Sequence, residues 1–248
     1  MNYNKNLSLI IFLILIGFDI FLWLNIFFFN FNQNKIYFLN VGQGDSSLIN
    51  LKKIFILIDA GPNSKINQSL AQAFKTKRNY IDLAIITHPQ LDHFGGFTGL
   101  LDKYDFGAFI INGREGDDKS KNLYNELINK IKNKNIPIII LSAGDKIIYQ
   151  DNLIEILSPD KNWIQSAELN DTGLVLKIKT FSFSSLFTAD INSFLEDYLI
   201  SKYDLKADIL KVAHHGSKYS SNPIFRTDLN GNILIFKKDN KFIVQTEK

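Results

Sequence analysis

A nearly continuous apolar segment runs from Leu7 to Phe31. The strongly polar residues inside it are Ser8, Asp19, Asn25 and Asn30. As an α-helix of 25 residues, the segment would extend roughly 37 Å, more than the hydrocarbon core of about 30 Å. A cleaved signal peptide has a shorter apolar region followed by small residues, and no such residues follow here. The pattern predicts an uncleaved single-span membrane anchor over residues 1–34. A buried helix of a soluble protein is the alternative.

The charges beside this segment give a weak orientation signal. Lys5 and the amino terminus precede it, and Lys35 follows it. The positive-inside rule slightly favours a cytoplasmic amino end. We therefore expect residues 35–248 to lie outside the cytoplasm.

Residues 35–248 alternate between short apolar runs and amphipathic segments, which is typical of a single α/β domain. Strands are expected at Ile36–Val41, Ser46–Asn50, Ile54–Ile58, Leu83–Thr87, Phe106–Ile111, Ile136–Leu141, Lys146–Tyr149, Leu153–Leu157, Leu174–Lys179, Phe183–Thr188 and Ile209–Ala213. Helices are expected at Ile66–Lys77, Gly95–Tyr104, Lys119–Lys132 and Asn192–Ser201. In the third helix, Leu123, Leu127 and Ile131 would share one face. Residues 232–245 resemble a hairpin.

Composition narrows the candidate chemistry. The chain has no cysteine, which excludes disulfides, thiolate zinc sites, iron–sulfur clusters and a cysteine nucleophile. The net charge is only +3, from 28 basic and 25 acidic residues, too little to indicate nucleic-acid binding by charge alone. The four histidines are therefore the more informative residues.

Potential metal ligands follow directly after apolar strands. They are Asp59, His88 with the loop to His93, Asp190, and the pair His214-His215. Sites in α/β sheets lie outside the carboxyl ends of strands, and imidazole and carboxylate suit zinc, manganese or iron. A tight turn can bring His88, Asp92 and His93 around one or two cations, and Gly95-Gly96 then lets the next helix begin close by.

These residues resemble the metallo-β-lactamase superfamily, whose metal-binding loop reads His-x-His-x-Asp-His. The surrounding segments resemble more narrowly the carboxy-terminal hydrolase domain of ComEC-type DNA-uptake competence proteins, from about Ile36 to Ser221. The segments that carry this resemblance are Phe38-Leu39-Asn40-Val41-Gly42-Gln43-Gly44-Asp45, Ile58-Asp59-Ala60-Gly61, His88-Pro89-Gln90-Leu91-Asp92-His93, Asn170-Asp171-Thr172-Gly173-Leu174-Val175-Leu176, Phe187-Thr188-Ala189-Asp190 and Leu210-Lys211-Val212-Ala213-His214-His215-Gly216-Ser217-Lys218.

The resemblance implies an αββα sandwich with one or two zinc or manganese ions per chain, and hydrolysis by a metal-bound hydroxide. His88 would bind the first metal. Asp92 and His93 would bind the second. Asp190 would bridge both, and His214 or His215 would complete the set. Catalysis would depend on Asp92 and Asp190.

Further residues are expected around this centre. Asp59 would orient a ligand imidazole, with a plain turn residue as the alternative. Gln43 and Asp45 would line the site or form only a strand turn. Asn170 would face the first metal or cap a loop, and Lys218 would meet a substrate phosphate or be solvated.

Two departures from the family pattern stand out. Gln90 occupies the position of a histidine or aspartate, and its uncharged amide is a poorer ligand. The segment after His214-His215 lacks the family's further strand–helix unit, so the domain should be shortened at its carboxy-terminal side, with an exposed sheet edge.

The sequence therefore predicts a membrane-anchored, extracytoplasmic metallohydrolase, a phosphodiesterase or nuclease related to DNA uptake. DNA and a separate channel protein are the candidate partners, because a single span cannot form the channel. Two alternatives stay open: a hydrolase of small esters or headgroup phosphodiesters, and a degenerate binding module without turnover.

Overall fold

The computed structural model of the chain describes residues 3–31, 33–74, 78–214 and 225–248, with the side chains of residues 7–24 in the first helix. The chain divides into two units, Met1–Gln33 and Asn34–Lys248. Because their mutual placement is not defined, each unit is described by itself.

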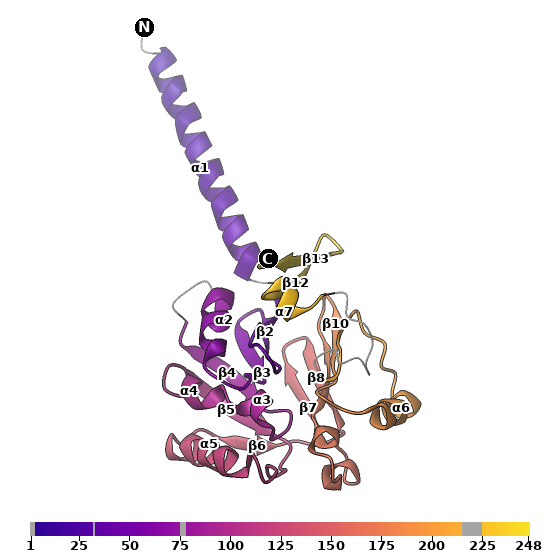
Figure 1. Ribbon diagram of the computed structural model, residues 1–248. Helices are drawn as coiled ribbons and strands as arrows, with labels where there is room; N and C mark the ends of the chain where they lie inside the picture. The colour runs from indigo at the N-terminus through magenta and orange to yellow at the C-terminus, as the bar shows by residue number, and fades with distance from the viewer. Residues whose placement is uncertain (1–2, 32, 75–77, 215–224) are drawn as a thin grey trace. The chain divides into compact units, whose positions relative to one another are not determined.

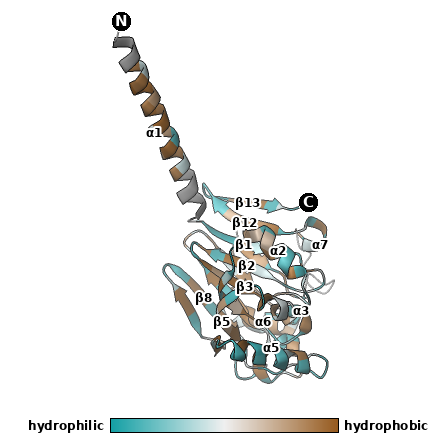
Figure 2. Ribbon diagram, turned by 90° about the vertical axis from the view of Figure 1, so that its left-hand side faces the viewer, coloured by the Kyte–Doolittle hydropathy of each residue, from teal (hydrophilic) through white to brown (hydrophobic). Residues whose placement is uncertain are grey.

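The first unit is a single helix, α1 (Tyr3–Phe31). Its segment Leu7–Leu24 has a mean hydropathy of 2.7 and none of it is buried. In Figure 2 most of the ribbon of this stretch has the colour of hydrophobic residues. By length and composition the helix can cross a membrane.

The second unit contains two β-sheets (Figure 1). The first has eight strands in the order β13-β12-β1-β2-β3-β4-β5-β6, and these span Lys241–Thr246, Ile233–Lys238, Asn34–Phe38, Ser47–Leu51, Ile54–Ile58, Tyr80–Ile85, Asp105–Ile111 and Ile138–Ile140. The second has five in the order β11-β10-β9-β8-β7, and these span Ile209–Lys211, Ser184–Phe187, Val175–Lys179, Asn152–Ser158 and Lys146–Tyr149.

Apolar side chains of one strand alternate between the two faces of the first sheet, and those on the inner face pack against the second sheet. In β3, Ile56 and Ile58 face the second sheet and pack with residues such as Leu176 and Phe187. Leu57, between them, faces the opposite way toward the helices. Successive side chains of a strand point to opposite faces, so one strand contributes to two buried layers.

Helices cover both outer faces. The helices α2 (Lys65–Phe74), α4 (Phe97–Leu100) and α5 (Lys121–Asn133) pack on the first sheet. Helix α6 (Ser193–Lys202) packs on the second sheet through Leu195 and Leu199. The remaining short helices are α3 (Leu91–Phe94), α7 (Thr227–Asn230) and the 3₁₀ turns η1 (Trp163–Gln165) and η2 (Leu169–Thr172). The four layers α, β, β and α confirm the expected sandwich (Figure 1).

Two helix predictions were wrong in detail. The helix expected over residues 95–104 is shorter, since α4 covers only Phe97–Leu100, and a separate short helix, α3, precedes Gly95 and Gly96. In α5 the buried face contains Tyr124, Leu127 and Ile131, whereas Leu123 is 46% exposed. Tyr124 takes the inner position because its ring packs against Phe94, with centroids 5.1 Å apart.

The carboxy-terminal hairpin is confirmed as β12 and β13, which extend the first sheet beside β1. In the second sheet, β11 is the last strand among the residues that the structure describes. It pairs with β10 in parallel, with Phe187 opposite Lys211.

Gly96 lies where two backbone segments touch. Its N–H donates to Gly61 O at 2.8 Å, and a Cβ added to it would lie 2.2 Å from Ala60 O. We expect Gly96→Ala to lower the free energy of unfolding by about 1–3 kcal/mol, because the two segments must separate. Denaturant unfolding would measure this change. Gly99→Ala is the matched control: no atom lies within 4 Å of its added Cβ, and as a helix residue it should gain stability. Equal stability of the two variants would contradict the prediction.

Candidate metal centre

The carboxyl ends of strands from both sheets meet at one edge of the sandwich. β3 and β4 are parallel neighbours, with Ile58 opposite Ile85, so the residues that follow them lie side by side. Leu174, just before β9, donates its N–H to Thr87 O at 3.0 Å, which ties the second sheet to the same edge. Candidate ligands distant in the sequence are thereby brought together.

Three of these ligands form a compact buried group. Among the described residues, one ligand atom each from His88, His93 and Asp190 all lie within 4.8 Å of one another. The His88 and His93 rings are 4.1 Å apart at their centroids, and His93 Nε2 is 3.3 Å from Asp190 Oδ2. Two imidazoles and one carboxylate are the donor set of many catalytic zinc sites, so these side chains fit a divalent metal.

Asp59 connects the group to the strand ends. Its Oδ2 is 2.9 Å from His93 Nδ1 and accepts the Thr87 hydroxyl at 2.8 Å, while Oδ1 accepts the Thr87 N–H at 2.9 Å. With Asp59 as the hydrogen-bond acceptor of His93 Nδ1, the opposite ring nitrogen, Nε2, is directed toward Asp190. This is the geometry that the predicted orienting role requires.

Burial and neighbouring charge shift the pKa values of the two histidines in opposite directions. Burial, reinforced by the charge of His93, lowers the pKa of His88 to about 3. Burial also opposes the charged form of His93, but the Asp59 and Asp190 carboxylates outweigh it and raise the pKa of His93 to about 10. Burial raises the pKa of Asp59, with His93 acting against that rise. The centre therefore attracts positive charge between its carboxylates.

Backbone strain occurs at the same edge. Asp59, Ala189 and His214 have φ angles of 56°, 49° and 54°, in the left-handed region that residues other than glycine rarely adopt. Each of them follows a strand. Asp59 and His214 are among the candidate ligands, and Ala189 directly precedes Asp190. Such strain typically occurs at functional sites.

Comparison with known proteins agrees with this geometry. Residues 39–231 match the metallo-beta-lactamase superfamily. The chain belongs to the metallo-β-lactamase superfamily. It is also 24% identical over 233 residues to ComE operon protein 3 of Bacillus subtilis (strain 168), a match that covers 85% of this chain but 29% of that protein. The domain is thus ComEC-like, and the chain spans less than a third of that relative's length.

Solved structures of the superfamily are similar at low identity. The metallo-beta-lactamase fold protein YhfI from Bacillus subtilis has 16% identity and a TM-score of 0.45, over 65% of each chain. MEM-A1, a subclass B3 metallo-beta-lactamase from a soil metagenome library, has 14% identity and a TM-score of 0.49, over 74% of this chain and 78% of that one.

The other predicted ligands lie outside the three-residue group. Asp92 lies in the first turn of α3 and is half-buried. Its charge acts on His88, but it is not a member of the compact group among the described residues. The side chain of His214 is exposed, and its backbone N–H donates to Asp190 Oδ1 at 3.2 Å. His215 and Lys218 lie outside the described residues, so their roles stay predictions.

The predicted lining residues occupy mixed positions. Gln90 is half-buried, with Oε1 3.1 Å from His88 Nε2. Asp45 is buried, and its N–H donates to Asp92 O at 3.2 Å, whereas Gln43 is exposed. The Oδ1 atom of Asn170, on η2, is buried and has no hydrogen-bond partner among the described residues.

Sequence reasoning missed two polar residues of this metallo-β-lactamase centre. The Thr87 hydroxyl lies 3.0 Å from His88 Nδ1 besides contacting Asp59. Lys211 forms an ion pair with Asp45, and both side chains are largely buried. A lysine within the apolar run that contains β11 was the available signal, because a buried lysine requires a charged partner.

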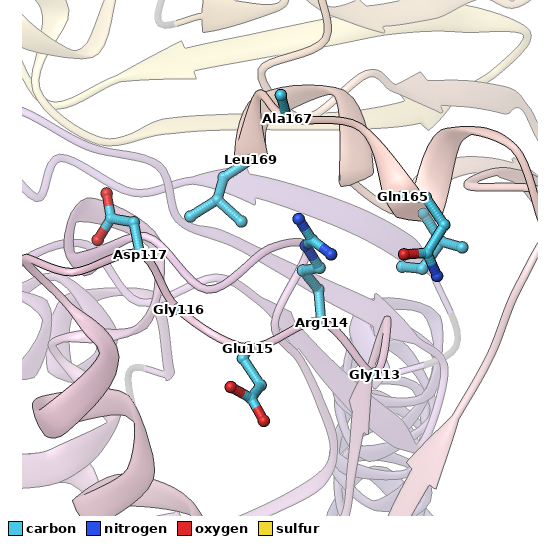
Figure 3. A pocket seen from close by; sticks show the side chains of 9 residues that line it. Gly113, Arg114, Glu115, Gly116, Asp117, Gln165, Ala167 and Leu169 are labelled. Carbon is cyan, nitrogen blue, oxygen red and sulfur yellow. The ribbon is translucent and has the colours of Figure 1, made fainter.

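A hollow of about 400 Å³ lies between the polar loop after β5 and the η1–η2 segment (Figure 3). Arg114 reaches across it and donates to Ser166 O at 3.0 Å. The loop is fixed to the site, since Ser120 Oγ donates to Pro89 O at 3.0 Å and Asn112 Nδ2 donates to Thr172 O at 2.7 Å.

Proposed function

We propose that the chain is a membrane-anchored, metal-dependent phosphodiesterase of the metallo-β-lactamase superfamily that acts as a nuclease related to DNA uptake. The buried group of His88, His93 and Asp190 is the observation that supports it most directly. The group contains two imidazoles and a carboxylate within ligand distance of each other, and a further carboxylate, that of Asp59, contacts His93. This arrangement resembles a hydrolytic centre more than a structural polar cluster.

The chain's own residues have separable roles in this proposal. His88, His93 and Asp190 hold a zinc or manganese ion, which supplies Lewis acidity and makes water easier to deprotonate. Asp59 accepts from His93 Nδ1 and thereby presents Nε2. Asp92 directly precedes His93 in the chain, and His214 donates its backbone N–H to Asp190 Oδ1 at 3.2 Å; these two residues complete the ligand set or accept a proton from the attacking water.

Similarity to ComE operon protein 3 supports the link to DNA uptake. The apolar helix α1 supports a membrane anchor. Lys5 before the span and Lys35 after it favour a cytoplasmic amino end. The domain is therefore proposed to lie outside the cytoplasm, where DNA and a separate channel protein are its candidate partners.

One observation favours a different substrate. A cleft of about 720 Å³ is lined by Asp45 and Lys211 together with apolar residues of β11, β12 and β13. Two of its cations are already paired, Lys211 with Asp45 and Arg226 with Asp228. An ester with an apolar body, such as a headgroup phosphodiester, suits that lining better than a polyanion does.

A hydrolysis assay on the full chain in detergent separates these possibilities. Single-stranded DNA, double-stranded DNA and a chromogenic bis-phosphodiester are each incubated with Mn²⁺ or Zn²⁺, and again with a chelator. We expect DNA cleavage that the chelator returns to background. Hydrolysis of the small ester without DNA cleavage would favour the headgroup substrate. Bound metal without any turnover would instead indicate a binding module.

A further inference from the structure

Lys211 and Asp45 form a buried ion pair beside the metal centre. Their side chains are 15% and 10% exposed. Lys211 ends β11 next to β10, and its carbonyl oxygen accepts the Thr188 hydroxyl at 2.8 Å, two residues before Asp190. Asp45 is fixed on the opposite side, where its carbonyl oxygen accepts the Gly61 N–H at 2.9 Å. The pair thus spans the two sheets at the edge that carries the ligands.

The ammonium of Lys211 acts on more than its direct partner. Burial favours the neutral amine, yet the carboxylates of Asp45, Asp190 and Asp59 outweigh this effect and raise the pKa of Lys211. Lys211 therefore stays charged among three acids, one of which is a proposed metal ligand.

The charges of these groups balance with one metal ion. Asp45, Asp59 and Asp190 are buried and contribute three negative charges when ionised. Lys211 neutralises one of them, and a single divalent ion neutralises the other two. Uncompensated charge in a low-dielectric interior is costly, and a second divalent ion would leave these three acids and Lys211 with an excess of two positive charges.

The arrangement of ligands agrees with that balance. The compact group has three members among the described residues, and a catalytic zinc site typically uses three protein ligands and keeps a fourth position open. Gln90, whose uncharged amide oxygen lies 3.1 Å from His88 Nε2, brings no negative charge for a further cation.

We propose that the Lys211 ammonium takes the place of a second metal ion, so that this centre holds one divalent cation per chain. Lys211 is a positioning residue: through its charge it keeps Asp45 and Asp190 compensated at the edge where a two-metal site would hold its second ion. This inference rests on the proposed metal-dependent function, and it specifies the stoichiometry of that site.

Metal content provides the test, without reference to turnover. The full chain in detergent is dialysed to equilibrium against Zn²⁺, and separately against Mn²⁺, and bound metal is measured by mass spectrometry. We expect one ion per wild-type chain. In Lys211→Met the ratio should rise toward two, because the space and the negative charge become available to a cation. Lys211→Gln provides a second neutral variant, and Lys211→Arg should keep the ratio at one.

Lys177→Met is the matched control. Lys177 is also buried, at 5% exposed on β9, but its ammonium donates to the backbone oxygen of Asp204. Its replacement should leave the ratio at one. Circular dichroism confirms folding of every variant.

The possible outcomes differ in what they overturn. Two ions in the wild-type chain would refute the inference and leave the proposed hydrolase intact. A ratio that stays at one in folded Lys211→Met and Lys211→Gln would refute the role of Lys211. No bound ion in the wild-type chain would refute both the inference and the proposed function.

Discussion

Asp190→Asn is expected to reduce metal-dependent hydrolysis by about 10³-fold or more, because the several kcal/mol that a bound metal contributes to the transition state are lost with its carboxylate. Asp190 Oδ2 lies 3.3 Å from His93 Nε2, and Oδ1 accepts the His214 N–H at 3.2 Å. The amide keeps the size of the side chain and an acceptor for that N–H. It removes the only negative charge in the three-residue group among the described residues.

Initial rates with saturating metal measure the loss, and the free energy of unfolding shows whether the fold survives. Asp197→Asn serves as the control, since Asp197 is an exposed acid on the nearby helix α6 and its charge has no part in the centre. Asp190→Ala should lose activity as well, because it removes the same carboxylate from the group. Full turnover in a folded Asp190 variant would eliminate the mechanism proposed above.

The sandwich could be predicted because its signals are local and repeated. Each apolar strand carries its own alternation, as Ile56, Leu57 and Ile58 illustrate. Chain direction then places the residues after parallel strands at one edge. The adjacency of Asp59 and His88 after the parallel strands β3 and β4 follows from these two facts, whereas the approach of Asp190, after β10 of the second sheet, also depends on how the two sheets stack.

The parts that could not be predicted depend on three-dimensional packing. The helix expected to begin at Gly95 begins instead at Phe97, and the backbone of Gly96 lies against the turn at Ala60. The choice of Tyr124 over Leu123 in α5 depends on the position of the Phe94 ring. Periodicity contains no information about either neighbour.

The pairing of Lys211 with Asp45 is a further case. Each residue could be located in a strand or turn, but their partnership depends on how the two sheets stack, which the sequence pattern does not encode. The same limitation applies to Asp92. Sequence similarity assigns it to a metal, whereas the structure leaves it outside the compact group.

Asp59→Asn is expected to weaken metal binding by about 10–100-fold, the usual effect of removing a hydrogen-bonding partner of a ligand histidine. Asp59 Oδ2 faces His93 Nδ1 at 2.9 Å, and the amide can present an NH₂ group there that leaves the imidazole tautomer undirected. Asp59→Ala should have a larger effect on folding. It leaves His93 Nδ1 and both Thr87 donors buried without their acceptor, at a cost of about 3–5 kcal/mol in the free energy of unfolding.

Calorimetric titration with Zn²⁺ measures the affinity, and urea unfolding measures the stability. Asp82→Asn is a suitable control, because Asp82 also accepts a backbone N–H, from Phe55 at 2.8 Å, yet its ion pair with Arg78 is partly exposed and should contribute no more than about 1 kcal/mol. The two Asp59 variants make the test specific: the Asn variant should lose affinity with most of its stability retained, and the Ala variant should lose both. Wild-type affinity in folded Asp59→Asn would mean that His93 is oriented by its packing against His88 and Thr87, and that the acid serves only to satisfy buried donors.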